Sequence, residues 1–268
     1  MTMGVEYGPA LFSLLAMLGL ATLVWLLSLP LRNASIVDSF WSLFFLTGAV
    51  TYALAVGSSG ARFTLVAVLL LIWAVRLAAY ITWRNHGRGE DRRYQAIRAR
   101  NQPHYEVKSL VYVFGLQAVL AWLIALPLFA ALSSPSPLGW LDGLGVMIWL
   151  IGFGFETIGD WQLARFKTHP ALAGAVMDRG LWRYTRHPNY FGESLIWWGF
   201  WLIAAGAGHA WTIISPLLMT FMLFRVSGVA LLEKDLQARH PAYADYVRRT
   251  NAFVPGPPRR VSLTRETS

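Results

Sequence analysis

Seven apolar segments, each about as long as a membrane is thick, dominate this sequence. A helix needs about 20 predominantly apolar residues to cross the hydrocarbon core of a bilayer. The candidate segments run over residues 8–31, 36–56, 61–83, 109–132, 139–163, 189–207 and 210–232. Inside a bilayer no water can satisfy an exposed backbone, so such segments have to be helical. The sequence therefore predicts an all-α integral membrane protein with seven transmembrane helices.

The composition agrees with this class and excludes several kinds of chemistry. Of the 268 residues, 56% are hydrophobic and 14% are charged, and the formal net charge is +9. Apolar segments separate the basic clusters, which favours a membrane surface and an anionic cofactor over nucleic acid. The chain has no cysteine, so disulfides, thiolate catalysis and cysteine-ligated metals are excluded. The histidines show no metal-ligand spacing, and we expect no metal.

Basic residues occupy alternate connections between the apolar segments. They gather in the loops 84–108 and 164–188 and in the region after Glu233, whereas the alternate connections near 57–61, 133–138 and 206–210 carry almost none, with Arg62 as the exception. Loops on the cytoplasmic side of membrane proteins are enriched in lysine and arginine. We therefore expect the N-terminus outside and the C-terminus in the cytoplasm, in a bacterial inner (plasma) membrane.

The same pattern predicts the domain organisation. Residues 1–257 are expected to form a single membrane domain, of which the amphipathic segment 233–255 lies along the cytoplasmic surface. Residues 258–268, which begin at the second of two consecutive prolines, are expected to be a disordered tail.

The densest group of polar residues is Arg179–Glu193, with the sequence RGLWRYTRHPNYFGE. Arginine forks suit phosphate groups, and Pro188 suits the first turn of a helix. Asn189 and Glu193 are four residues apart and share one face of that helix. Arginines beside a membrane helix are usually topology signals, which is the alternative for any one of them. Taken together, the group predicts a binding site for a nucleotide cofactor.

Other ionisable residues lie within the apolar segments or at their ends. Such groups usually face a cavity or one another, and interhelical ion pairs are the alternative. On the third segment, Arg76, Tyr80 and Arg84 share one helical face. Tyr80 could donate a hydrogen bond or a proton to a substrate carbonyl. The alternative is an interfacial tyrosine with no chemical role. The full set is Asp38, Arg76, Glu156, Asp160, Glu193, Arg225 and Glu233.

Gly152-Phe153-Gly154 begins like a dinucleotide-binding fingerprint. That fingerprint requires a preceding strand and a third glycine, where this chain has a membrane segment and Thr157. The glycines instead predict close packing between helices.

Several motifs resemble the steroid 5-alpha-reductase superfamily (3-oxo-5-alpha-steroid 4-dehydrogenase-like). Those near the C-terminus are Thr185–Glu193, Glu233 and the segment from His240 to Pro255. Upstream, Ser35–Trp41 and Gly89–Tyr94 resemble its bacterial branch, formerly a domain of unknown function (DUF1295). Isoprenylcysteine carboxyl methyltransferases carry an element similar to RHPNYFGE, but the upstream motifs favour the reductase branch.

The resemblance implies a membrane reductase that uses NADPH and passes a hydride to the conjugated double bond of a lipid or steroid-like enone. It implies Tyr80 and Asp38 as catalytic residues. The chain lacks the family's Gln-Glu pair on the second helix, where Asp38 is the only acid, and this bears on the steroid substrate more than on the cofactor. The cofactor-binding residues expected are Asp160, Arg165, Lys167, Arg179, Arg183, Tyr184, Arg186, His187, Asn189, Tyr190, Glu193, Trp197, Arg84, Arg88, Glu233 and Tyr246.

Two other functions are open. An S-adenosylmethionine-dependent methyltransferase would use the same helix, but its cofactor has no phosphate and would not need the arginines of the 84–108 loop. A lipid-binding or transport protein would more often show repeats and helices broken at the midplane. The partners expected are the lipid bilayer and a lipophilic small molecule, with no nucleic acid and a monomeric chain.

Overall fold

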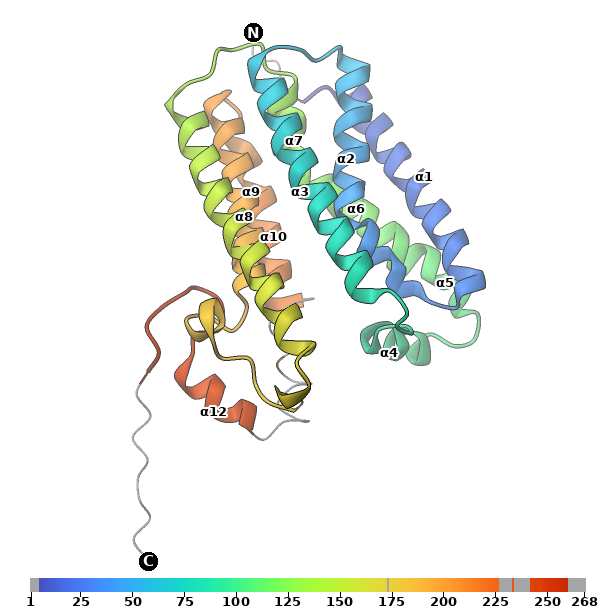
Figure 1. Cartoon of the computed structure of the whole chain (residues 1–268). Helices are drawn as coiled ribbons and strands as arrows, with labels where there is room; N and C mark the ends of the chain where they lie inside the picture. The colour runs from blue at the N-terminus through green and yellow to red at the C-terminus, as the bar shows by residue number, and fades with distance from the viewer. Residues whose placement is uncertain (1–4, 173, 227–232, 234–241, 260–268) are drawn as a thin grey trace, which may run out of the picture. The chain divides into compact units, whose positions relative to one another are not determined.

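The computed structural model describes residues 5–172, 174–226, 233 and 242–259 (Figure 1). Within these residues every regular element is a helix, and the one β-type contact is an isolated bridge between Thr185 and Asn251. The all-α prediction is confirmed. Parts of the predicted seventh segment (227–232), the amphipathic segment (234–241) and the tail (260–268) lie outside the described residues.

The chain divides into two compact units. Unit 1 comprises Met1–Gly143 and Phe200–Ser215, and unit 2 comprises Leu144–Gly199 and Pro216–Ser268. The boundaries of five apolar segments agree closely with α1, α2, α3, α8 and α9, because these segments end at residues that stop a helix. Gly57, for example, caps the second long helix in the left-handed conformation that glycine adopts without steric cost.

Unit 1 contains three long helices that run side by side in Figure 1, α1 (Tyr7–Leu31), α2 (Val37–Val56) and α3 (Ala61–Asn85). The shorter elements that follow are α4 (Arg92–Arg100), α5 (Tyr105–Ser109), a π-helical turn (Leu110–Gly115), α6 (Leu116–Ile124) and α7 (Leu126–Leu132). The packing between α1 and α2 depends on Gly48, where an added Cβ would lie 2.8 Å from the sulfur of Met17.

The predicted segment 109–132 is divided in the structure. Its first part leaves α-geometry in the π-helical turn, and its second part begins a new helix, α7, after Ala125. Pro127 stands in the first turn of α7, where its missing N–H costs no hydrogen bond. A proline in the interior of one continuous helix would have removed a backbone hydrogen bond from the apolar core, so the chain restarts instead.

Unit 2 is built on α8 (Trp140–Lys167) and α9 (Pro188–Gly206), whose ends nearest Gly143 and Phe200 belong to unit 1. It also contains the 3₁₀ turn η4 (Gly180–Arg183), α10 (Ile214–Phe221) from Pro216 onward with the π-helical turn Met222–Val226, and α12 (Ala242–Arg249). Tyr243 and Tyr246 of α12 are buried and Arg248 is exposed, as the amphipathic pattern predicts.

Within the described residues, five helical stretches are long and apolar enough to cross a membrane. They are Tyr7–Leu31, Ala34–Val56, Ala61–Asn85, Tyr105–Ile124 and Trp140–Thr168. This indicates an integral membrane protein. The sixth predicted segment corresponds to α9, and the seventh to a shorter apolar helix over Ala210–Arg225.

Arg62, the exception to the charge pattern, is neutralised inside unit 1. Its guanidinium pairs with Asp142 at 2.9 Å through both Nε and Nη2, and only 2% of each residue is exposed. Nη1 also donates to the Ser134 hydroxyl and the Ser136 carbonyl. Because the paired carboxylate removes its net charge, Arg62 does not disturb the charge asymmetry from which the topology was predicted.

Candidate functional site

The predicted site residues fall in both units. Unit 1 holds Asp38 on α2, Tyr80 and Arg84 on α3, and Arg88 in the loop after α3. Unit 2 holds all the others, and most of them lie along the end of α8, the turn η4 and the start of α9.

Close contact between α8 and α9 creates the polar centre of unit 2. At Gly152 an added Cβ would lie 2.6 Å from the carbonyl oxygen of Gly192 and 2.8 Å from the amide nitrogen of Ile196. Gly159 approaches the amide nitrogen of Asn189 in the same way, at 3.2 Å. The predicted close packing at Gly152 is confirmed, whereas Gly154 faces open space. The glycines let two backbones meet where the polar residues of both helices are concentrated.

Asp160 and Asn189 are brought together at this crossing. The Asn189 side-chain amide donates to Asp160 Oδ1 at 3.1 Å, although the residues are 29 positions apart. Asn189 Oδ1 is buried and has no hydrogen-bond partner among the described residues. A buried carbonyl oxygen without a donor costs free energy, so it marks a position where a ligand N–H would be stabilising. Glu193, one turn further along α9, is 8% exposed, and Glu156 of α8 is 2% exposed.

Arg186 and His187 bind the protein's own C-terminal segment (residues 242–259) and Glu233. Arg186 makes a bidentate pair with Glu233, at 2.7 Å from Nε and 2.8 Å from Nη2. Its Nη1 donates to the carbonyl oxygens of Val247 and Thr250. His187 Nε2 lies 3.0 Å from Glu233 Oε1. These contacts occupy the Arg186 guanidinium within the protein, so the predicted phosphate contacts of this loop fall mainly to Arg179 and Arg183.

The pKa values of this cluster follow from its burial and pairing. Burial lowers the pKa of His187, and the neighbouring Glu233 offsets only part of this effect. Burial by itself would raise the pKa of Glu233, but hydrogen bonds from His187 and Arg186 bring it below its usual value. Glu233 is therefore held as a carboxylate and His187 as a neutral imidazole near neutral pH.

Further hydrogen bonds attach the C-terminal segment to the loop before α9. The Thr185 hydroxyl donates to the Phe253 carbonyl at 2.7 Å, and Gly256 N donates to the Tyr184 carbonyl at 3.0 Å. The Tyr246 hydroxyl donates to the Trp182 carbonyl at 2.5 Å. Burial raises the pKa of Tyr246, which keeps this donor protonated. Tyr246 thus has a structural contact in addition to its predicted role at the cofactor.

The remaining predicted residues of unit 2 surround this core. Arg165 and Lys167 are exposed at the end of α8, and the Arg165 guanidinium lies 5.6 Å from the Trp161 ring centroid. The Tyr190 ring stacks on His187 at 5.5 Å. Trp197 is fully buried on α9, and Tyr184 is exposed.

In unit 1, Tyr80 lies between two arginines of its own helix. The guanidinium carbons of Arg76 and Arg84 lie 5.4 Å and 5.8 Å from the Tyr80 ring centroid. The predicted shared face of α3 is therefore confirmed. Cations over the ring stabilise the developing negative charge when a phenol gives up a proton, which suits the proposed donor.

Asp38 accepts hydrogen bonds from two residues at the start of α4. Its Oδ2 accepts from Arg93 at 3.0 Å, and its Oδ1 accepts from the Tyr94 hydroxyl at 2.5 Å. Gln117 in turn donates to the Tyr94 oxygen at 3.1 Å. Burial, together with the Asp38 carboxylate, raises the pKa of Tyr94 well above its usual value, so Tyr94 is a fixed donor. Asp38 therefore fixes the start of α4, and its predicted assistance to Tyr80 stays a prediction.

The acidic residues of the same loop are also occupied. Glu90 accepts from the backbone N–H of Ala34 at 2.8 Å and forms a bidentate pair with Arg98. Arg98 also lies 4.3 Å from the Tyr105 ring centroid. Arg88 is exposed and keeps its charge available. The upstream family motif Gly89–Tyr94 thus holds the loop after α3 against the junction between α1 and α2.

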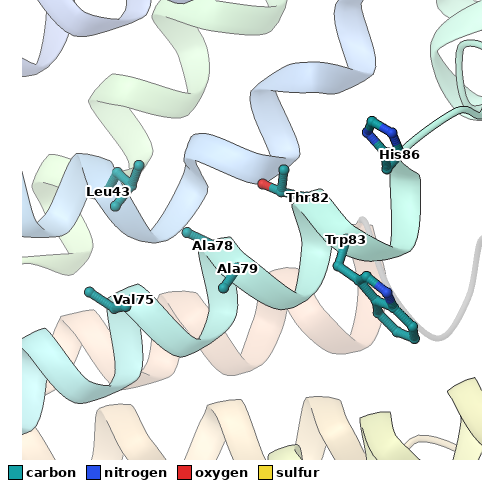
Figure 2. A pocket seen from close by; sticks show the side chains of 7 residues that line it. All are labelled: Leu43, Val75, Ala78, Ala79, Thr82, Trp83 and His86. Atoms are coloured by element: carbon teal, nitrogen blue, oxygen red, sulfur yellow. The ribbon is translucent and has the colours of Figure 1, made fainter.

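An apolar pocket of about 770 Å³ lies along α3. Figure 2 shows its lining spread along α3 from Val75 to His86, with Leu43 contributed by α2. Thr82 and His86 are its polar members, toward the end of the helix where the loop begins. Such a lining suits a lipophilic molecule with one polar end.

Residues 24–250 match the family described as "Protein of unknown function (DUF1295)". The chain belongs to this family. The membership confirms the DUF1295 family that the upstream motifs had indicated. The chain is also 26% identical over 278 residues to the "Uncharacterized protein C594.04c" of Schizosaccharomyces pombe, which covers 92% of this chain and 80% of that protein. No solved structure matches the chain.

Sequence reasoning missed several residues that the structure brings to these sites. Tyr94, the partner of Asp38, was part of a motif but had no assigned role. Arg249 and Arg259 line a pocket with Arg179 and Arg183. The two prolines before Arg259 are a local sign that the chain there is stiff, but they do not say what it contacts. Among the described residues there is no cluster of three metal-ligating acids, histidines or cysteines.

Proposed function

We propose that this protein is an integral-membrane reductase that uses NADPH to reduce a conjugated C=C bond of a lipid or steroid-like enone. The proposal includes seven membrane crossings, with the N-terminus outside and the C-terminus in the cytoplasm. The family membership is compatible with an enzyme, and the five long apolar helices, α9, the shorter apolar helix Ala210–Arg225 and the exposed arginines of the connecting loops support the topology.

The observation that carries the proposal is the unpaired carbonyl oxygen of Asn189. Asp160 orients the Asn189 side chain by accepting from its amide nitrogen, which leaves Oδ1 as a buried acceptor. A carboxamide N–H, such as that of a nicotinamide, would satisfy this acceptor. The residues present therefore fit the cofactor. When bound, NADPH would supply the hydride.

The surrounding residues would bind and orient this cofactor. Arg179 and Arg183 are exposed at the turn η4 and have no ion-pair partner among the described residues, so they can neutralise phosphate groups. Glu193 would accept from the ribose or the carboxamide, and the buried Trp197 would exclude water. Arg186, His187 and Glu233 would act indirectly, by fixing the loop from which α9 begins.

On the substrate side, the proposal assigns the carbonyl oxygen to the Tyr80 hydroxyl. As hydride adds to the β-carbon, negative charge develops on that oxygen, and a donor there stabilises the enolate. Tyr80 would give its proton to the enolate oxygen; the resulting enol would become the saturated ketone by gaining a solvent proton at the α-carbon and returning the proton on oxygen to Tyr80. Arg76 and Arg84 beside the ring would stabilise the phenolate in the interval. The pocket of Figure 2 has the apolar lining that a lipid chain requires.

Thermal unfolding of the detergent-purified protein tests the proposal, with NADPH, NADH and S-adenosylmethionine compared in parallel. A cofactor that binds only the folded state stabilises it by about 2.7 kcal/mol at a hundred times its dissociation constant. We expect NADPH to raise the melting temperature. Stabilisation by S-adenosylmethionine alone would replace the reductase with a methyltransferase, and no shift with any of the three would favour a non-enzymatic role.

A pair of variants on α9 makes the test specific to the site. Asn189→Ala removes the buried acceptor, and we expect NADPH affinity to fall about tenfold, since leaving a ligand donor unpaired costs roughly 1–3 kcal/mol. Ser194→Ala is the matched control, because Ser194 hydrogen bonds Thr220 and has no assigned cofactor role. Equal NADPH affinity in the two variants would remove Asn189 from the site.

A further inference from the structure

Four arginines line one cavity of unit 2, which we call the arginine pocket. Arg179 and Arg183 come from the turn η4, and Arg249 and Arg259 come from the C-terminal segment. The cavity has a volume of about 570 Å³, and Asp178 is the only acid among the described residues that line it. Positive residues near a membrane surface are common, but that tendency does not explain why four of them surround one hollow.

The protein itself holds the two sides of the arginine pocket together. The Arg249 guanidinium pairs with Asp178 at 2.6 Å. The backbone N–H of Arg259 donates to the carbonyl oxygen of Arg249 at 2.8 Å. The Tyr246 hydroxyl, one turn before Arg249, donates to the Trp182 carbonyl. Because these bonds join the segments directly, the pocket exists before any ligand arrives, and binding does not have to order it.

The charge of the pocket is not compensated. Asp178 neutralises Arg249, while Arg179, Arg183 and Arg259 have no ion-pair partner in the part of the chain that the structure describes. An excess of three positive charges therefore surrounds one cavity. At such short range the positively charged guanidinium groups repel one another. A bound anion would attract all of them and so offset this repulsion.

The arrangement favours a particular kind of anion. A phosphomonoester carries a charge of roughly −1.5 to −2 at neutral pH and presents three acceptor oxygens. Guanidinium groups match such oxygens in a planar, bidentate manner. Each phosphate of a diphosphate bridge carries about one charge, which fewer cations neutralise. Three unpaired arginines around one cavity thus suit a dianion better than a bridging phosphate.

We infer that the arginine pocket binds a phosphomonoester dianion, and that the C-terminal segment supplies half of its cations. This inference rests on the proposed function, in which the phosphomonoester is the ribose 2′-phosphate that distinguishes NADPH from NADH. The same chemistry occurs in the headgroup of phosphatidic acid, which is a second source of the ligand. The pocket would then make the C-terminal segment a determinant of cofactor preference.

Affinities of the full-length protein in detergent for NADPH, NADH and adenosine 2′-monophosphate test this inference. In the wild type we expect NADPH to bind more tightly than NADH and adenosine 2′-monophosphate to compete with NADPH. In Arg259→Gln, NADPH affinity should fall roughly tenfold or more, as for a lost charge-assisted hydrogen bond, while NADH affinity is unchanged. Arg248→Gln is the matched control, because Arg248 neighbours Arg249 on α12 but does not line the pocket.

The outcomes separate the inference from the proposed function. Equal binding of NADPH and NADH by the wild type, or equal loss of both in Arg259→Gln, would overturn the inference and leave the reductase in place. If neither nucleotide binds, the reductase fails. The pocket still stands in that case if phosphatidic acid or adenosine 2′-monophosphate stabilises the wild type and not Arg259→Gln. No stabilisation by any of these phosphomonoesters would overturn the pocket as well.

Discussion

Replacing Arg186 with methionine is expected to detach the C-terminal segment from the start of α9. The side chain is 8% exposed and its Glu233 partner 13% exposed, so solvent does little to weaken their attraction. Methionine is similar in length and apolar, and it leaves His187 as the partner of Glu233 within the cluster. It also leaves the carbonyl oxygens of Val247 and Thr250 without this donor.

The magnitude follows from these contacts. Removing one partner of a buried ion pair costs about 3–5 kcal/mol, most of it from the charge that is left unpaired. We therefore expect Arg186→Met to destabilise the protein by about 4 kcal/mol, and a loss of that size lowers the melting temperature of a chain this long by roughly 10 °C. Arg183→Gln is the control, because an exposed arginine without a buried partner contributes within about 0.5 kcal/mol.

Two measurements check the reasoning. Thermal unfolding gives the overall loss, and limited proteolysis reports local opening of residues 242–259, which we expect to precede global unfolding in Arg186→Met. A double-mutant cycle with Glu233→Met should show coupling of about 1–3 kcal/mol between the two sites. If Arg186→Met melts like the wild type and instead loses NADPH affinity, Arg186 binds a phosphate and the structural reasoning is refuted.

The remaining predictions concern pH, packing and turnover. His187 and Glu233 both have lowered pKa values in the folded protein, so the unfolded state binds more protons, and stability falls on acidification from about pH 6.5 for His187 and from about pH 4.5 downward for Glu233, as unfolding midpoints from neutral pH to below pH 4.5 would show. Gly152→Ala should cost roughly 1–3 kcal/mol by forcing α8 away from α9, whereas Gly154→Ala, in open space, should not destabilise; equal melting of the two would contradict the crossing geometry. Tyr80→Phe should lower NADPH-dependent turnover much more than NADPH affinity, and wild-type turnover would exclude Tyr80 as the proton donor.

The positions of the helices could be predicted because they depend on local properties of the chain. A run of about 20 apolar residues, ended by glycine or a polar turn, has few alternatives to a membrane helix. Pro188 begins α9 as its preference for the first helical turn indicates. The break between α6 and α7 was less visible, because Pro127 lies in a run whose hydropathy continues on both sides.

The candidate site was predictable in composition but less so in its pairing. Asn189 was expected to lie at a polar site, and the structure adds that Asp160 orients it. Arg186 and Arg179 looked equivalent in the sequence, since a guanidinium binds a phosphate and a carboxylate through the same donors. The structure distinguishes them, because Glu233, 47 residues from Arg186, reaches only one of the two.

The sequence by itself determined that this is a helical membrane protein, where most of its long helices begin and end, and which family motifs it carries. Only the tertiary structure decided which charged side chains form ion pairs within the protein and which can bind a ligand. Asp38 meets Tyr94 across 56 positions, and Arg179 meets Arg259 in one pocket. Hydropathy and turn residues act over a few neighbouring positions, whereas the partner of a charged group depends on chain packing that brings distant segments together.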